Sequence, residues 1–117
     1  MKLVVAGGGS GGHIFAGIAV IDAWKNAYPE NPRVLFIGAR GRLEEKIVPE
    51  TAIPLILLKV SGLNRIGTLG KIKSACLLPF SIARAFDALW KMSPDAVLGI
   101  GGFASGPVMV AAMLYSV

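Results

Sequence analysis

A glycine-rich segment near the start of the chain constrains the fold more than any other feature. Residues 7–13 read Gly-Gly-Gly-Ser-Gly-Gly-His, after an apolar run over 3–6 and before an amphipathic stretch over 14–27. This order predicts a buried strand, a glycine loop and a helix. Glycine accepts positive φ and places no Cβ in the way of a ligand, and the free N–H groups of a helix N-terminus attract phosphate. A tight turn capped by Ser10 is the simpler alternative, but it needs fewer glycines.

Strand-like and helix-like segments alternate along the rest of the chain, whose 117 residues suffice for one domain. Further strands are expected over 33–37, 53–60 and 96–99, and further helices over 42–48, 71–92 and 107–116. Pro79 is expected either to kink the long helix or to start a second one. Such alternation predicts an α/β fold with a doubly wound, Rossmann-like parallel sheet.

A second glycine loop, over 101–106, follows the fourth expected strand. In doubly wound sheets the first and fourth strands are commonly neighbours, and ligands bind in the crevice outside their carboxyl ends. We therefore expect the two glycine loops to frame one crevice that holds two phosphates or one diphosphate.

His13 is the only histidine and directly follows the first loop. The positive end of a helix disfavours protonation of an imidazole, so we expect a neutral ring that accepts a proton from a hydroxyl group or hydrogen-bonds a phosphate. A structural role is the alternative. One histidine and one cysteine, Cys76, are too few ligands for a zinc site, and no metal is expected.

A dinucleotide site is a further alternative. Gly7, Gly9 and Gly12 satisfy the G-x-G-x-x-G pattern, which is weak by itself. NAD binding favours an acid at the end of the second strand, where this chain has none, whereas Arg40 and Arg42 suit the 2′-phosphate of NADP. A Walker-type loop is excluded because no Gly-Lys-Ser/Thr sequence occurs.

Composition points to anionic and apolar partners. The net charge is +5, with 54% hydrophobic and 16% charged residues. No apolar run reaches the roughly 20 residues that span a bilayer, and the first apolar run is too short for a signal peptide. A single cysteine excludes an internal disulfide and fits a reducing compartment. Charge alone suggests nucleic acid, but no nucleic-acid-binding motif accompanies it.

The long expected helix has two unlike faces. The expected core face carries Ala75, Leu78, Ile82, Phe86 and Leu89. The opposite face gathers bases and apolar residues: Lys73, Leu77, Phe80, Arg84 and Lys91. Such a mixture is typical of a surface that rests on an anionic membrane, and Lys59, Arg65 and Lys71 are placed to extend it. An interface with another domain is the alternative.

Four spaced motifs resemble the MurG family of bacterial glycosyltransferases. They are the segment 7–13, then Gly38 with Leu43-Glu44 and Val48-Pro49, then Val-Ser-Gly-Leu over 60–63, and the segment 94–107. The resemblance covers the chain in order and implies the N-terminal, acceptor-side domain of a two-domain GT-B enzyme. The implied domain spans 1–117 and is expected to be truncated, without the donor-binding C-terminal domain of the family. The family transfers N-acetylglucosamine from UDP-GlcNAc to lipid I, with inversion, to form lipid II for peptidoglycan.

The resemblance also implies roles for individual residues. It places Ser10, Gly11 and Gly12 around the donor UDP-GlcNAc. It implies that His13 assists catalysis. The residues implied to bind the acceptor diphosphate are Gly101, Gly102, Ser105 and Gly106. The family usually has threonine at position 10 and proline at position 16, where this chain has Ser10 and Ala16. No cofactor is implied.

The implied partners are UDP-GlcNAc, lipid I and an anionic membrane surface, without nucleic acid. The implied location is the cytoplasmic face of the bacterial inner membrane, as a peripheral protein. The chain by itself is expected to lack turnover. Two alternatives stay open: a related glycosyltransferase with another lipid acceptor, and a non-catalytic nucleotide- or NADP-binding module.

Overall fold

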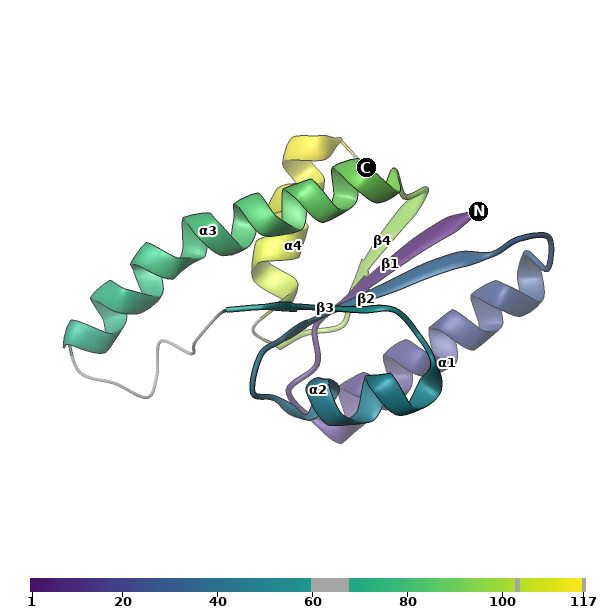
Figure 1. Ribbon diagram of the computed structural model, residues 1–117, viewed down its shortest axis with the longest axis horizontal. Helices are drawn as coiled ribbons and strands as arrows, with labels where there is room; N and C mark the ends of the chain where they lie inside the picture. The colour runs from purple at the N-terminus through teal and green to yellow at the C-terminus, as the bar shows by residue number, and fades with distance from the viewer. Residues whose placement is uncertain (60–67, 103, 117) are drawn as a thin grey trace.

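The computed structural model describes residues 1–59, 68–102 and 104–116, and the side chains of 68–77 lie outside that description. The elements are β1 (Lys2–Ala6), α1 (Gly11–Ala27), β2 (Arg33–Ala39), α2 (Leu43–Ile47), the 3-10 turn η1 (Val48–Thr51), β3 (Leu55–Leu58), α3 (Thr68–Met92), β4 (Ala96–Gly99) and α4 (Ser105–Tyr115). Strands and helices alternate as predicted (Figure 1).

The strands form one parallel sheet in the order β3-β2-β1-β4. In the register, Val4 of β1 lies opposite Leu35 of β2 and Val97 of β4. The winding reverses between β1 and β4, which confirms that the strands preceding the two glycine loops are neighbours. The doubly wound sheet is therefore confirmed.

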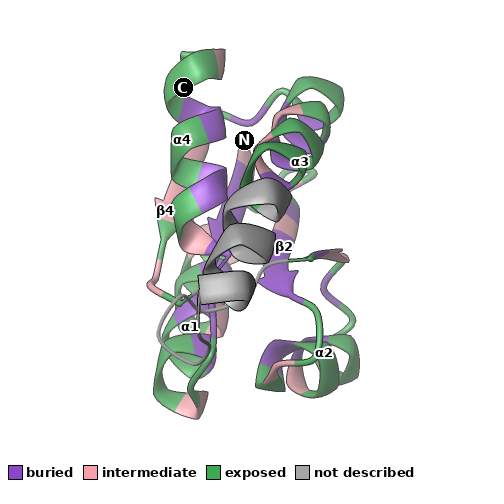
Figure 2. Cartoon of the chain, turned by 90° about the vertical axis from the view of Figure 1, so that its left-hand side faces the viewer, coloured by how far each residue is buried: buried purple, intermediate pink, exposed green. Residues whose placement is uncertain are grey.

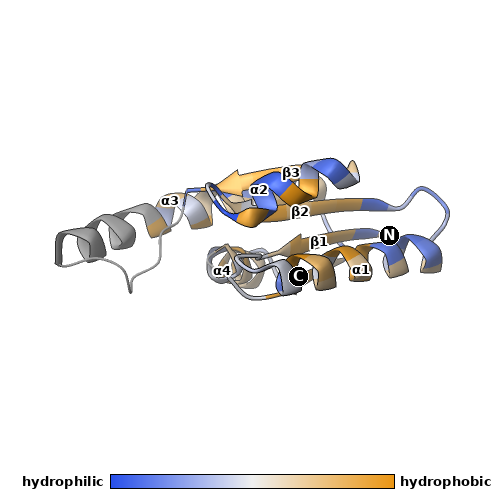
Figure 3. Ribbon diagram, turned by 90° about the horizontal axis from the view of Figure 1, so that it is seen from below, coloured by the Kyte–Doolittle hydropathy of each residue, from blue (hydrophilic) through white to orange (hydrophobic). Residues whose placement is uncertain are grey.

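Helices cover both faces of the sheet. Successive side chains of a strand point to opposite faces, and here both faces are apolar and need cover. Figure 1 shows α3 and α4 on one side and α1 and α2 on the other. On the α3–α4 side the buried cluster includes Val4, Ala6, Ile37, Leu58, Ala85, Leu89, Val108 and Ala111. On the α1–α2 side it includes Leu3, Val5, Ile14, Ile21, Val34, Phe36, Val48 and Ile53. The strands are almost continuously apolar (Figure 3), as parallel strands buried on both faces require.

Helix α1 begins at Gly11, three residues before the predicted start. Ser10 is its N-cap, with an extended φ of −125°, and its Oγ atom accepts the N–H of His13 at 3.3 Å. Gly17 faces the sheet, where a Cβ would lie 3.2 Å from Val5 and from Phe36. Glycine at this position lets α1 approach the sheet closely.

Helix α3 is continuous through Pro79, so the predicted alternative of a second helix starting there is wrong. Proline removes one backbone donor from the helix interior. The helix starts at Thr68, three residues earlier than expected.

The buried face of α3 differs from the predicted one. Ser81, Ala85, Ala88, Leu89 and Met92 are the buried residues among those described. Leu89 was predicted correctly, and Ile82 and Phe86 are half-buried against the core. Leu78 was predicted wrongly, because it is 46% exposed, and Ala75 lies outside the described side chains. Small side chains at 81, 85 and 88 let the helix approach the sheet, and Leu78, Phe80 and Trp90 stay exposed. Figure 2 shows exposed residues along much of α3.

Aromatic rings join α3 to α4. The ring of Tyr115 lies edge-on to Phe86 at 6.0 Å and to Trp90 at 6.2 Å between centroids. Phe86 and Trp90 stack at 6.3 Å. Edge-to-face pairs of this kind contribute about 0.5–1.5 kcal/mol each beyond their buried area, so the two helices form one packed unit.

Several boundaries differ from the expected ones. β2 runs through Gly38 to Ala39, and β3 is confined to Leu55–Leu58. The expected helix 42–48 is a short α-helix followed by the 3-10 turn, with Pro49 near the start of that turn. Residues 60–67 lie outside the description.

Candidate functional site

The two glycine loops touch at the carboxyl edge of the sheet. The N–H of Gly8 donates to the carbonyl oxygen of Gly101 at 2.9 Å. A Cβ on Gly102, whose φ is +89°, would overlap the carbonyl oxygen of Gly8. Glycine is needed there both for the left-handed backbone and for the close approach. The structure thus confirms that the two predicted loops meet.

The backbone donors of the first loop divide into two groups. Gly7 donates to the carbonyl of Ile37 at 3.0 Å, Gly8 donates to Gly101, and Gly9 donates to Oε1 of Glu44 at 3.2 Å. The next three N–H groups, of residues 10–12, have no acceptor in the described part of the chain. They stand at the N-terminus of α1, where the aligned peptides amount to about half a positive charge. The backbone N–H groups left free for a ligand therefore belong to Ser10, Gly11 and Gly12, the residues predicted to surround the sugar-nucleotide donor.

His13 stands between the two loops in the first turn of α1. Its Nδ1 atom lies 3.2 Å from the carbonyl oxygen of Gly8. A carbonyl oxygen only accepts, so Nδ1 carries the hydrogen in this contact. In the neutral ring, Nε2 then keeps its lone pair. A Cβ on Gly101 would lie 3.3 Å from Cε1 of the same ring, so the second loop borders the imidazole directly.

The second loop leads into α4. Gly101 and Gly102 adopt φ of +93° and +89°. Ser105 and Gly106 were predicted as loop residues, and this boundary is wrong because they form the first turn of α4. No side chain caps this helix start. The four residues predicted for the acceptor diphosphate thus comprise two loop glycines beside His13 and two residues at a helix N-terminus.

Glu44 is the site residue that the sequence reasoning assigned no role. It lies in α2 and is 1% exposed. One carboxylate oxygen accepts from Gly9 and the other accepts from Ala39 at 3.0 Å. In the sequence it resembles an ordinary exposed acid in the first turn of a helix, and its neighbour Glu45 is such an acid. The one available signal was its place in the motif that follows Gly38.

Comparison with known proteins shows the family. Residues 3–117 match the model of the glycosyltransferase family 28 N-terminal domain. The chain belongs to this family. The resemblance found in the sequence is thereby confirmed, as is membership of a family of transferases.

Two curated relatives illustrate the similarity. One from Myxococcus xanthus is 41% identical over 117 residues, which are 100% of this chain and 30% of the relative. One from Citrifermentans bemidjiense is 43% identical over 112 residues, which are 96% of this chain and 31% of the relative. Both are named UDP-N-acetylglucosamine–N-acetylmuramyl-(pentapeptide) pyrophosphoryl-undecaprenol N-acetylglucosamine transferase. The family 28 domain described here therefore spans about 30% of the length of these relatives.

A solved structure shares the fold. The crystal structure of Acinetobacter baumannii MurG matches with a TM-score of 0.79 at 23% identity, covering 99% of this chain and 33% of that one. This match confirms the predicted Rossmann-like, N-terminal GT-B architecture.

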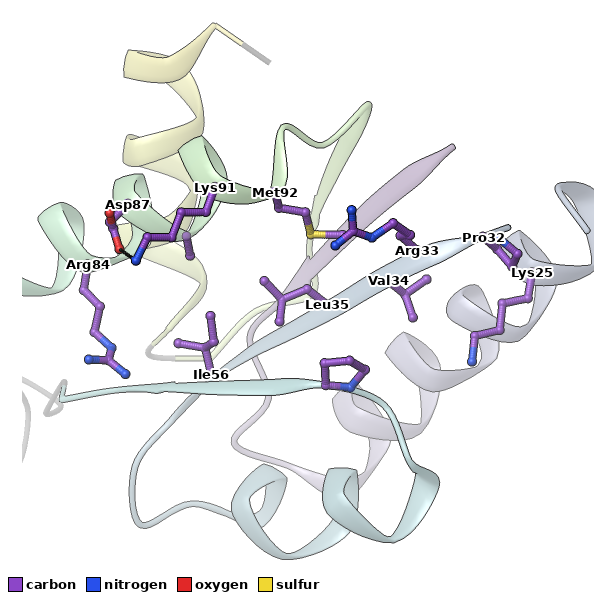
Figure 4. Close-up of a pocket in the computed structure, with 12 residues that line it drawn as sticks. Lys25, Pro32, Arg33, Val34, Leu35, Ile56, Arg84, Asp87, Lys91 and Met92 are labelled. Atoms are coloured by element: carbon purple, nitrogen blue, oxygen red, sulfur yellow. Dashed lines mark ion pairs between the residues drawn. The ribbon is translucent and has the colours of Figure 1, made fainter. Parts of the chain in front are cut away.

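The family 28 domain has a further cavity away from the glycine loops. It measures about 650 Å³ and lies between α3 and the β2–β3 part of the sheet. Figure 4 shows Lys25 and Arg33 at one end and Arg84 at the other, near the ion pair between Lys91 and Asp87 at 3.1 Å. Within the described residues, no group of three potential ligands is placed to hold a metal.

The residues predicted for membrane contact are exposed where the structure describes them. Phe80 is 75% exposed, and Arg84 and Lys91 are exposed on the same helix. Lys73 and Leu77 lie outside the described side chains. No helix in the described part of this family 28 domain is long and apolar enough to cross a bilayer.

Proposed function

We propose that this chain is the acceptor-side domain of an enzyme that moves N-acetylglucosamine from UDP-GlcNAc to lipid I. The carrying observation is the pair of glycine loops that meet around His13, with its Nδ1 atom held by Gly8. The names of relatives 41–43% identical across this chain supply the sugar donor and the acceptor. The donor-binding half is assigned to a second, C-terminal domain.

The proposed reaction is a direct displacement with inversion. The C4 hydroxyl oxygen of the acceptor sugar attacks the anomeric carbon, and the bond from that carbon to the UDP oxygen breaks. The bonding electron pair leaves with UDP, and the hydroxyl proton passes to Nε2 of His13. A positioned general base of this kind contributes about 10²–10⁴ in rate.

The helix N-termini supply the charge stabilisation. The free N–H groups of residues 10–12 face the departing diphosphate, where negative charge grows during the reaction. The first turn of α4, with Ser105 and Gly106, holds the diphosphate of the acceptor lipid. Both diphosphates are thus held by fixed peptide dipoles on either side of His13. The proposed steps use no cofactor.

A transfer assay tests this proposal. The complete gene product is given UDP-GlcNAc labelled in the sugar and a short-chain lipid I analogue, and label in the lipid product is measured. Transfer is the expected result. If the folded protein binds UDP-GlcNAc but does not transfer the sugar to lipid I, the acceptor is another lipid. A protein that binds NADPH tightly and UDP-GlcNAc not at all would favour the nucleotide-binding module instead.

We also propose that the protein rests on the cytoplasmic face of the inner membrane as a peripheral protein. The supporting observation is the exposed Phe80 beside a cavity of about 330 Å³ that is also lined by Arg40, Lys59 and Arg84. All seven acidic residues lie in the described part of the chain, and none forms an ion pair with these three cations. An exposed aromatic ring among uncompensated bases suits anionic headgroups.

A further inference from the structure

We propose that Glu44 is a positioning residue that sets the shape of the first glycine loop and confines the ligand to the donors of residues 10–12. Glu44 lies in α2, outside both glycine loops, and the steps proposed for sugar transfer do not use it. Its burial is nearly complete, at 1% exposure. A carboxylate is costly to bury without hydrogen-bond partners. The hydrogen bonds that Glu44 accepts therefore compensate for its burial.

Both carboxylate oxygens accept a backbone N–H. Oε1 accepts from Gly9 in the first loop, and Oε2 accepts from Ala39 at the end of β2, at 3.2 and 3.0 Å. Hydrogen bonds to a charged acceptor are roughly twice as strong as neutral ones. The side chain therefore ties the loop after β1 to the end of the neighbouring strand.

The backbone around the carboxylate is shaped to receive it. A Cβ on Gly8, whose φ is +132°, would come within 2.5 Å of the Glu44 carboxylate, and a Cβ on Gly38 would overlap its Cγ atom. Neither glycine leaves room for a side chain. The loop glycine and the strand glycine are thus needed partly because Glu44 occupies the space between them.

The contact with Gly9 has a chemical consequence for the ligand. It removes the Gly9 N–H from the set of free donors and places a negative charge behind the loop. An anionic diphosphate is thereby directed away from Gly9 and toward the N–H groups that begin α1, which have no internal acceptor in the described residues. Because Gly8 also holds His13, a shift of this loop moves the ring as well.

The test compares Glu44→Gln with Glu45→Gln in the complete gene product. Glutamine keeps the size of glutamate but presents an NH₂ group to one of the two N–H donors, so one bond is lost. Glu45 is a matched control, because it is exposed on the same helix and also accepts a backbone N–H, from Gly41 at 2.6 Å. Amide NMR shifts and UDP affinity are measured at a temperature where all variants are folded.

Glu44→Gln is expected to shift the amide signals of residues 9–13 and to weaken UDP binding by about tenfold or more. Glu45→Gln is expected to leave both unchanged within twofold. Shifts confined to Gly9 and Ala39, or UDP affinity retained in folded Glu44→Gln, would overturn the proposal. The affinity measurement rests on the proposed function, whereas the amide shifts do not. If the wild-type protein does not bind UDP, the proposed function is overturned. The amide shifts of Glu44→Gln then still test whether Glu44 sets the shape of the loop.

A measurement on the wild-type protein covers the case in which Glu44→Gln does not fold. UDP is titrated while the loop amides are followed by NMR. The amides of residues 10–12 are expected to move most, and that of Gly9 least, because Glu44 holds it. A largest shift at Gly9 would show that the ligand takes this donor from Glu44 and would overturn the proposal.

Discussion

The Nδ1 atom of His13 lies 3.2 Å from the carbonyl oxygen of Gly8, and the N–H of the same glycine donates to Gly101 at 2.9 Å. One peptide region therefore orients the candidate base and joins the two glycine loops. The direction of the Nε2 lone pair depends on the contact between the loops. This coupling makes the loop geometry as important to the proposed chemistry as the imidazole itself.

Replacing His13 by asparagine distinguishes the role of the ring as a base from its hydrogen bond to Gly8. The Asn side chain in His13→Asn places an amide NH₂ near the position of Nδ1 and so keeps a donor for Gly8, but it has no counterpart of Nε2. Turnover of the complete enzyme is expected to fall by about 10²–10⁴, with UDP-GlcNAc affinity close to wild type. His13→Ala is expected to lose turnover to the same extent. Full turnover in His13→Asn would remove the ring from the mechanism.

Alanine at two left-handed glycines tests the contact between the loops. Gly41 has φ of +79° and open space around its Cα, so Gly41→Ala is expected to cost about 1 kcal/mol from backbone strain alone. Gly102→Ala adds an overlap with the carbonyl of Gly8, and about 3 kcal/mol or more is expected. Thermal unfolding of both variants measures the difference. Equal losses would mean that the loops separate without cost.

Ser10 offers a test of the start of α1. Its Oγ atom accepts the N–H of His13, and loss of such a cap costs about 0.5–2 kcal/mol. Ser10→Ala is expected to lower the melting temperature, whereas Ser10→Thr keeps the hydroxyl and is expected to match wild type. A melting temperature unchanged in Ser10→Ala would contradict the capping role.

Phe80 tests the proposed membrane surface. Because the ring is 75% exposed, Phe80→Ser is expected to leave the melting temperature within a degree or two of wild type. Binding to vesicles that contain anionic lipid, measured by flotation, is expected to fall several-fold. Val20→Ser is the control, because Val20 is exposed on α1, on the opposite side of the sheet. Equal flotation of Phe80→Ser and wild type would place the membrane contact elsewhere.

The winding of the chain could be predicted because it depends on features that sequence displays directly. Apolar runs followed by Gly7 and by Gly101 mark two strand ends, and the doubly wound topology brings such ends together. The place of His13 in the first helical turn followed from its position after the loop. These inferences needed only the order of the segments and general rules of parallel sheets.

The side-chain environment of Glu44 and the orientation of α3 could not be predicted in the same way. Burial of Glu44 depends on the space left by Gly8 and Gly38, which are far apart from each other in the sequence. The buried face of α3 is chosen by Ser81 and Ala85, whose small size permits close packing, although a hydropathy pattern favours Leu78. In both cases the deciding factor is shape, which periodicity does not record.

The aromatic contacts of Tyr115 with Phe86 and Trp90 pack the C-terminal end of α4 against α3. The start of α4 lies at the site, and the proposed membrane contact lies on α3. Under the proposed membrane contact, packing of α4 on α3 would couple the orientation of Ser105 and Gly106 to that of the membrane-facing helix. The membrane would then orient the carboxyl edge of the sheet, where the glycine loops lie. It would fix the direction from which the diphosphate of the lipid acceptor arrives while the lipid tail stays in the bilayer.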